Sequence, residues 1–335
     1  MSASRQSLWL AGALATCSSA HSDSRRWAWL RFDMYGMFES TFHVETDRFV
    51  LSNSSPAALS DLPYRGEFGR PRPAQLAALP LPPRPMPSHH VLRPLKAWRY
   101  VGVYGRELML CAAVVRIGRA RQSFWAVWDR HGRQLLERTR LGEGGVRLSP
   151  GRVVVNDRGL RLELALEEEA GIEAVCPAGE SYAWTRKQGG VRAHGVLTLE
   201  GEQRPVDGRG VIDDTAAYYE RHTSWRWSAG VGMATDGREV AWNLVSGVND
   251  PAADSERTVW IGGEAFEPPS SQFMSDLAGV DKLSFASEAV RKRSDNLLLV
   301  RSRYRQPFGA FSGELPGGVT LAEGYGVMEE HQAWW

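Results

Sequence analysis

The last strand-like segment of the chain, LAEGYGVMEEHQAW (residues 321–334), alternates larger polar side chains with small ones. Every second residue of an extended strand faces the same side, and one face here carries Glu323, Tyr325, Glu329 and His331. If this face is buried, it can hold proton donors and acceptors that work near neutral pH, because burial raises the pKa of a carboxyl group. If it faces solvent, the same residues are surface charges. The sequence leaves both interpretations open.

A second alternating segment, RHTSWRWSAGVG (residues 221–232), separates an aromatic face from a polar one. Trp225 and Trp227 lie on the face that continues with alanine and valine, whereas His222 and Arg226 lie on the other. Alternation of this kind is typical of a strand with one buried face. We therefore expect Trp225 and Trp227 to face the interior. The polar face is either solvated or part of a binding site.

We predict a catalytic group made of His222, Glu323 and Tyr325. Both segments contain glycines, within 230–232 and 324–326, where two backbones can approach closely. Closure of a barrel would set the polar residues of the two strands opposite each other. An imidazole beside a buried carboxylate would then shift the pKa of both groups. In the competing interpretation, His222 and Glu323 are solvated on opposite sides of the molecule.

Aromatic residues are the main candidates for ligand binding. The chain has 13 tryptophans, and an indole ring suits both a core and a ligand cavity because it combines a large apolar face with one N–H donor. The residues that we predict to bind a ligand are Trp225, Trp227, Arg226, Trp242, Tyr304, Glu329 and His331. A run of alternating arginines beside Tyr304 forms either a clamp for a carboxylate or a solvated strand edge.

Motifs for a metal or a nucleotide are absent from the sequence. The cysteines, Cys17, Cys111 and Cys176, show no C-x-x-C spacing, and there is no phosphate-binding loop and no HExxH segment. We therefore expect no metal and no cofactor. The net charge of +1 gives no general attraction to nucleic acid. No strongly apolar run reaches the ~18 residues that a membrane span needs. The oligomeric state stays open.

Closely spaced strand-like runs separated by turn residues predict an all-β fold, with two antiparallel halves that are barrels or sandwiches. The expected helices are short ones near 214–220 and 271–278. The predicted organisation is a disordered or misassigned extension at 1–61, a proline-rich arm at 62–97, a first β domain at 98–205 and a second β domain at 206–335.

The N-terminal residues resemble a weak signal peptide over 8–20. This run is short and is broken by polar residues, which favours a cytoplasmic protein. Residues 1–60 show no amphipathic period, and we expect them to be dispensable for stability.

Several phrases of the sequence resemble the bacterial family known as domain of unknown function 2804. They are ELMLCAAVVRIGRARQSFWAVWDR, RHTSWRWSAGVG, GEAFEPP and SRYRQPFGAFSGELPGGVTLAEGYGVMEEHQAWW. The resemblance extends over residues 62–335. The family has no established activity and so implies no catalytic residues. More distantly, the chain is similar to tandem lipocalin-like proteins, a group with carotenoid hydratase-like proteins and pericyclase-type cyclases. That likeness implies two lipocalin-like halves with a ligand between or inside them, and no metal or redox cofactor.

Two functions stay open on these grounds. One is a cofactor-free enzyme, such as a hydratase, isomerase or cyclase, that acts on an apolar or amphipathic small molecule through buried carboxyl, tyrosine and histidine groups. The other is a non-catalytic carrier or sensor of a lipid-like ligand. A carrier needs a closed apolar cavity, whereas an enzyme needs at least one ionisable pair that faces such a cavity.

Overall fold

The computed structural model describes residue 59 and residues 62–142, 144–297 and 300–335. Across this part of the chain the regular structure is almost entirely β-strand, in antiparallel sheets, with one short 3-10 helix, η1 (Ala74–Ala78). The expected all-β fold with two antiparallel halves is confirmed. The predicted extension at 1–61 lies outside the described residues, except for Leu59.

The first half is a sheet of eleven strands, whose main path runs β7-β6-β5-β4-β13-β12-β10-β9-β8, while β11 pairs with β12 and β1 with β11. Its strands are β1 (Tyr64–Glu67), β4 (Lys96–Tyr104), β5 (Leu108–Ile117), β6 (Ala120–Asp129), β7 (Gln134–Leu141), β8 (Val146–Ser149), β9 (Arg152–Asp157), β10 (Leu160–Leu166), β11 (Ile172–Ala178), β12 (Ser181–Leu199) and β13 (Glu202–Ala217).

The second half is a sheet of eight strands in the order β17-β16-β15-β14-β21-β20-β19-β18. Its strands are β14 (His222–Ala234), β15 (Glu239–Ser246), β16 (Thr258–Ile261), β17 (Glu264–Phe266), β18 (Gly279–Val280), β19 (Leu283–Leu297), β20 (Val300–Leu315) and β21 (Val319–Trp334). A separate hairpin pairs β2 (His89–His90) with β3 (Arg93–Pro94).

The chain passes from the first sheet to the second between Ala217 and His222. The boundary expected at 205/206 instead falls inside β13, which lies in the middle of the first sheet. The division into folding domains remains a prediction. Both sheets are open, because the path of the first ends at β7 and β8 and that of the second at β17 and β18.

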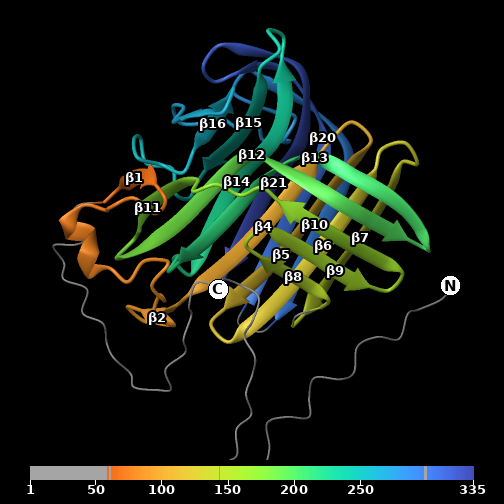
Figure 1. Cartoon of the computed structure of the whole chain (residues 1–335). Helices are drawn as coiled ribbons and strands as arrows, with labels where there is room; N and C mark the ends of the chain where they lie inside the picture. The colour runs from red at the N-terminus through yellow and green to blue at the C-terminus, as the bar shows by residue number, and fades with distance from the viewer. Residues whose placement is uncertain (1–58, 60–61, 143, 298–299) are drawn as a thin grey trace, which may run out of the picture. The chain divides into compact units, whose positions relative to one another are not determined.

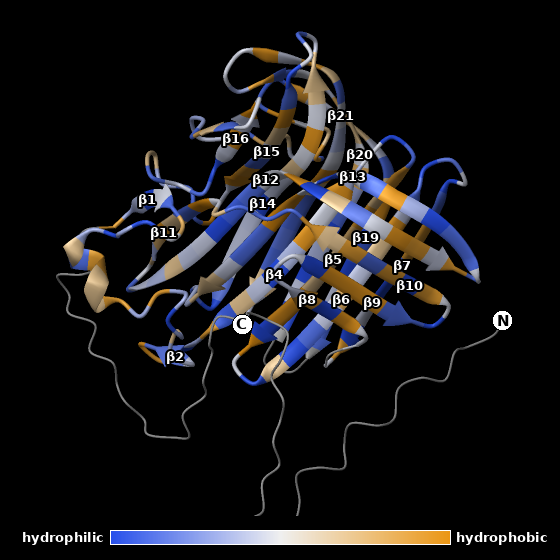
Figure 2. Cartoon of the chain, viewed as in Figure 1, coloured by the Kyte–Doolittle hydropathy of each residue, from blue (hydrophilic) through white to orange (hydrophobic). Residues whose placement is uncertain are grey.

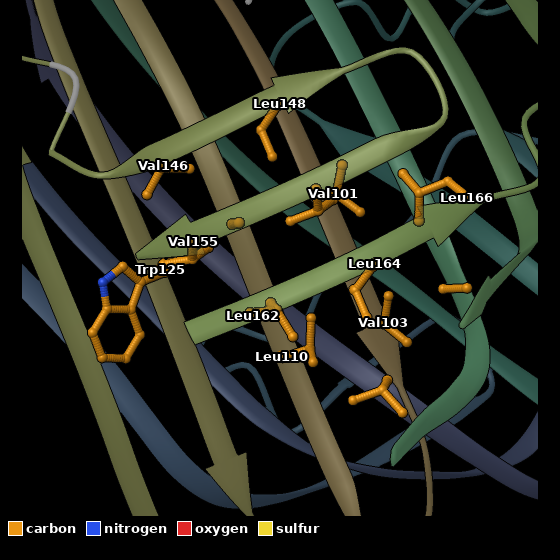
Figure 3. Close-up of a cluster of buried hydrophobic side chains, with 14 of the residues drawn as sticks. Val101, Val103, Leu110, Trp125, Val146, Leu148, Val155, Leu162, Leu164 and Leu166 are labelled. Carbon is orange, nitrogen blue, oxygen red and sulfur yellow. The ribbon is translucent and has the colours of Figure 1, made fainter. Parts of the chain in front are cut away.

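The first sheet folds over itself. Strands β8, β9 and β10 cross β4, β5 and β6 (Figure 1), and the apolar side chains of both layers meet between them (Figure 3). In β10, Leu162 and Leu164 are buried whereas Arg161 is exposed. The alternating colours along these strands in Figure 2 show the same pattern. A period of two thus builds a core on one face of this strand.

The proline-rich arm lies against the first sheet rather than free in solvent. Leu76, Leu79 and Leu81 are each at most 1% exposed and pack with Trp184 of β12 and other residues of one apolar cluster. The arm is also held by charge, because Arg72 pairs with the buried Glu173 of β11. These apolar and ionic contacts make the arm part of the core.

The prediction of two short helices, near 214–220 and 271–278, is wrong. Residues 214–217 continue strand β13, and residues 271–278 contain turns, bends and one isolated bridge but no helix. In β13 the pairing with β4 on one side and β12 on the other satisfies the backbone hydrogen bonds. Tertiary pairing therefore overrides any local helical preference at this point.

The inner faces of the two sheets pack on each other through one mixed apolar cluster. Tyr100 of β4 meets Trp227 of β14 edge to face, with 5.3 Å between the ring centroids. At another point Glu288 of β19 accepts a hydrogen bond from the indole of Trp128 in β6 (2.9 Å) and pairs with Arg130. Tyr100 and Trp227 also line the cavity described next.

Candidate active site

A cavity of about 310 Å³ lies between the two sheets. Aromatic rings form much of its wall, with Trp98, Tyr100 and Phe124 from the first sheet and Trp225 and Trp227 from the second. Cavities that are mainly apolar with a few polar groups are the usual form of small-molecule sites. The geometry therefore marks this cavity as the candidate site.

Strand β14 supplies its two tryptophans through simple alternation. Trp225 and Trp227 point to the cavity. Arg226, which lies between them in the sequence, points to the other face and pairs with Glu330 at 3.1 Å. Trp227 is only 5% exposed and donates its indole N–H to Asn243 of β15 (2.8 Å). The polar face of this strand is thus mostly surface.

The carboxyl group of Glu329 in β21 is the most chemically distinctive group on the wall. It is buried, and it accepts one hydrogen bond from the indole of Trp225 (2.9 Å) and one from the side-chain amide of Gln306 (3.1 Å). Burial raises the pKa of Glu329 to about 7, although hydrogen bonding by Trp225 and Tyr304 opposes the rise. Near neutral pH the group therefore exists in both its acid and its base form.

His331 lies two residues further along the same face of β21. Its Nε2 is 2.7 Å from the hydroxyl of Ser302, and its ring contacts those of Trp225 and Tyr304. Burial, helped by the charge of Arg291, lowers the pKa of His331 to about 3. The imidazole is therefore neutral at physiological pH and does not act as a cationic acid there.

A second polar group on the wall centres on Lys187 of β12, which is 1% exposed. Its ammonium group pairs with Asp213 of β13 and lies 3.3 Å from Glu256, which also accepts a hydrogen bond from Asn249 (2.9 Å). Burial alone would lower the pKa of Lys187, but the two carboxylates raise it. Lys187 thus stays protonated, and burial raises the pKa of Glu256.

Residues 142–335 match the family described as domain of unknown function 2804. The chain belongs to this family. The matched segment contains Lys187, Asp213, Glu256, Glu329 and His331 of the cavity, whereas the aromatic wall of β4 and β6 precedes it.

Solved structures with a similar arrangement are remote in sequence. An AttH-type protein from Nitrosomonas europaea is 14% identical, with a TM-score of 0.41 over 71% of this chain and 92% of that one. Kievitone hydratase from Nectria haematococca is 12% identical, with a TM-score of 0.44 over 71% of this chain and 89% of that one. CghA is 8% identical, with a TM-score of 0.40 over 71% and 87%. No curated protein sequence matches the chain significantly. Likeness at this level says nothing about the activity of this family member.

The predicted proximity of His222 and Glu323 is wrong. In the pairing of β14 with β21, His222 lies opposite Trp334 whereas Glu323 lies opposite Met233, eleven residues further along β14. A rise of about 3.3 Å per residue separates the two by roughly 35 Å. His222 is exposed and stacks on Trp334, with 4.6 Å between ring centroids.

Glu323 and Tyr325 do meet, because the Tyr325 hydroxyl donates to the Glu323 carboxylate at 3.1 Å. Neither belongs to the cavity wall, and Glu323 is exposed. The competing interpretation, in which His222 and Glu323 are solvated far apart, describes this arrangement. Barrel closure was the wrong premise, since the two strands are neighbours in an open sheet and their register alone fixes which residues meet.

Of the predicted ligand-binding residues, the cavity wall includes Trp225, Trp227, Tyr304, Glu329 and His331. That they bind a ligand remains a prediction. The other two do not reach the cavity: Arg226 faces outward, and Trp242 is fully buried in a different cluster, where it donates to Ser228 (3.1 Å).

Lys187 and Arg291 were missed by the sequence analysis. Each sits in a strand that reads as polar and half-exposed, yet each is at most 2% exposed. One signal could have found Lys187, because lysine is rare in this chain, with only four among 40 lysines and arginines.

The described residues contain no group of three or more His, Cys, Asp or Glu side chains placed to hold a metal ion. Within the same ranges no helix is both long and apolar enough to cross a membrane.

Proposed function

We propose that the cavity binds an apolar or amphipathic small molecule and that Glu329 exchanges a proton with it. The observation that carries this proposal is the carboxyl group of Glu329, buried on an aromatic wall and held by Trp225 and Gln306. An acid–base group is most effective when its pKa lies near the working pH, and the pKa of Glu329 is raised to about 7.

The shape of the wall favours a ligand with a broad apolar body. Trp98, Trp225 and Phe124 present large ring surfaces, and such rings gain free energy by covering apolar area and by stacking on planar groups. A proton delivered to, or taken from, a carbon of this body is the step that hydration, double-bond isomerisation and acid-promoted cyclisation share. The proposed activity belongs to this group of cofactor-free reactions.

Deuterium exchange tests the proposal without knowledge of the product. A ligand that co-purifies with the protein is first identified by native mass spectrometry and then incubated with fresh protein in D2O. We expect the wild type to incorporate carbon-bound deuterium into the ligand or its product, and Glu329→Gln to bind the ligand without incorporation. The amide keeps the size of the carboxyl group but cannot exchange a proton in this way.

A non-catalytic carrier is the second candidate, and the aromatic wall of the cavity favours it. In that case the ligand co-purifies but acquires no deuterium, in the wild type as in Glu329→Gln. If no small molecule co-purifies and none is retained after incubation with a lipid extract, both candidate functions are contradicted.

A further inference from the structure

Arg291 of β19, on the cavity wall, has a hydrogen-bonding atom without a partner among the described residues. This atom, Nη1 of the guanidinium group, is buried. Tyr304 of β20 lies beside it, and its hydroxyl hydrogen-bonds with Glu329. A buried donor that makes no hydrogen bond is costly, and native structures satisfy nearly all such groups with protein, water or ligand. Arg291 therefore points to a missing acceptor.

The surroundings of Arg291 explain why it can take an acceptor with negative charge. Its guanidinium carbon lies 3.8 Å from the ring centroid of Phe124 and 5.1 Å from that of Tyr304. Nη2 donates to Thr139 (3.0 Å), and Nε lies 2.8 Å from Glu137, whose side chain is 35% exposed. A partly solvated carboxylate neutralises a cation less than a buried one does, so positive potential remains on the cavity side.

The other buried cation on the wall differs in this respect. Lys187 is 1% exposed and has two carboxylate partners, Asp213 and Glu256. The protein therefore already compensates the charge of Lys187, whereas Nη1 of Arg291 has no partner among the described residues. Of these two cations, Arg291 is the one left to bind a negatively charged group.

We infer that the cavity recognises an organic anion, an apolar molecule with one oxyanion head such as a carboxylate or sulfonate, and that Arg291 binds this head. The inference rests on the proposed function, because it specifies the ligand of the same cavity. The head accepts a hydrogen bond from the guanidinium Nη1. The apolar body then lies against the rings of Phe124 and Trp225.

Two fluorescent probes with the same ring system distinguish recognition of an anionic head from general binding of an apolar molecule. Anilinonaphthalene sulfonate carries an oxyanion, and N-phenylnaphthylamine lacks it. We expect both probes to bind the wild type. Arg291→Gln should weaken sulfonate binding about tenfold or more, because hydrogen bonds to a charged group are the strong ones. Arg291→Lys keeps the charge but loses the guanidinium geometry and should weaken it about threefold or more. Binding of the neutral probe should change by less than about twofold in either variant.

The control is Arg226→Gln, which removes an arginine from the outer face of β14 and should change neither dissociation constant. Arg291→Lys keeps the test valid even if Arg291→Gln fails to fold, because it retains the positive charge beside Glu137. Equal effects on both probes, or no effect of either Arg291 variant on the sulfonate, would overturn the inference while leaving cavity binding intact. Failure of both probes to bind the wild type would contradict the proposed function itself.

Discussion

The indole rings of Trp98 and Trp225 are almost parallel, with 6° between their planes and 6.3 Å between their centroids. Trp98 belongs to the first sheet and donates its N–H to Asp213, whereas Trp225 belongs to the second and donates to Glu329. The ring contact therefore links the sheet that holds one buried carboxyl group to the sheet that holds the other. The packing of these two rings therefore also determines where the two carboxyl groups lie.

Replacing Trp225 by phenylalanine should raise the pKa of Glu329 further. The indole N–H stabilises the ionised carboxylate, and this hydrogen bond opposes the rise caused by burial. The titration is measured by carbon NMR of protein with labelled glutamate carboxyl groups, with Glu329→Gln to assign the signal. Trp98→Phe is the matched control, because the indole N–H of Trp98 donates to Asp213 and not to Glu329. An unchanged midpoint in Trp225→Phe would show that the indole does not stabilise the carboxylate.

Glu329→Gln should gain stability relative to the wild type as pH rises. The folded-state pKa of Glu329 is raised to about 7 from an ordinary value of 4.5. Between these values the folded state holds a proton that the unfolded state has lost, so the wild type loses about 1.4 kcal/mol per pH unit, or roughly 3 kcal/mol in total. Urea unfolding of both proteins from pH 4 to pH 8, in steps of about one unit, gives the difference. A difference that does not vary with pH would mean that Glu329 titrates normally.

The opposite dependence is expected for His331→Gln. The pKa of His331 is lowered to about 3, so below its ordinary value of 6.5 the unfolded state binds a proton that the folded state rejects. Wild-type stability is therefore lost as pH falls from 6.5 toward 3, by about 1.4 kcal/mol per pH unit. The variant lacks this loss, and its amide can keep a hydrogen bond to Ser302. Parallel wild-type and variant curves over this range of pH would contradict the prediction.

Leu79→Ala should destabilise the protein by about 2–5 kcal/mol, although Leu79 lies in the proline-rich arm. Its side chain is fully buried in the cluster that includes Trp184, so truncation leaves a cavity. Leu92→Ala is a control from the same arm, because Leu92 is 88% exposed and its loss should cost less than about 0.5 kcal/mol. Thermal or urea unfolding measures both. Equal effects would indicate that the arm is not part of the core.

The period of two was sufficient to predict which faces of the strands point inward. Trp225 and Trp227 face the interior as expected, and Leu162 and Leu164 are buried on one face of β10. The reason is physical, since a strand with one buried face must alternate to keep its charges in water. Glu329 is an exception, because it is buried on the same face as Val327, and the sequence left open whether that face is solvated.

The register between strands could not be predicted. His222 and Glu323 lie on adjacent strands, yet the pairing sets them eleven residues apart along β14. A local pattern predicts which face of a strand a residue lies on, but not which residue of the neighbouring strand lies opposite it. Nor does alternation reveal that a second sheet covers a polar face, which is why the buried cations Lys187 and Arg291 read as surface residues.

The family match begins at residue 142, after β7, and so divides the wall of the cavity. Lys187, Arg291 and Glu329 fall inside the matched segment, whereas Trp98 and Phe124 precede it. Substitutions of Phe124 in β6 would offer evolution a route to ligands of new outline that leaves the contact between Trp98 and Trp225 in place.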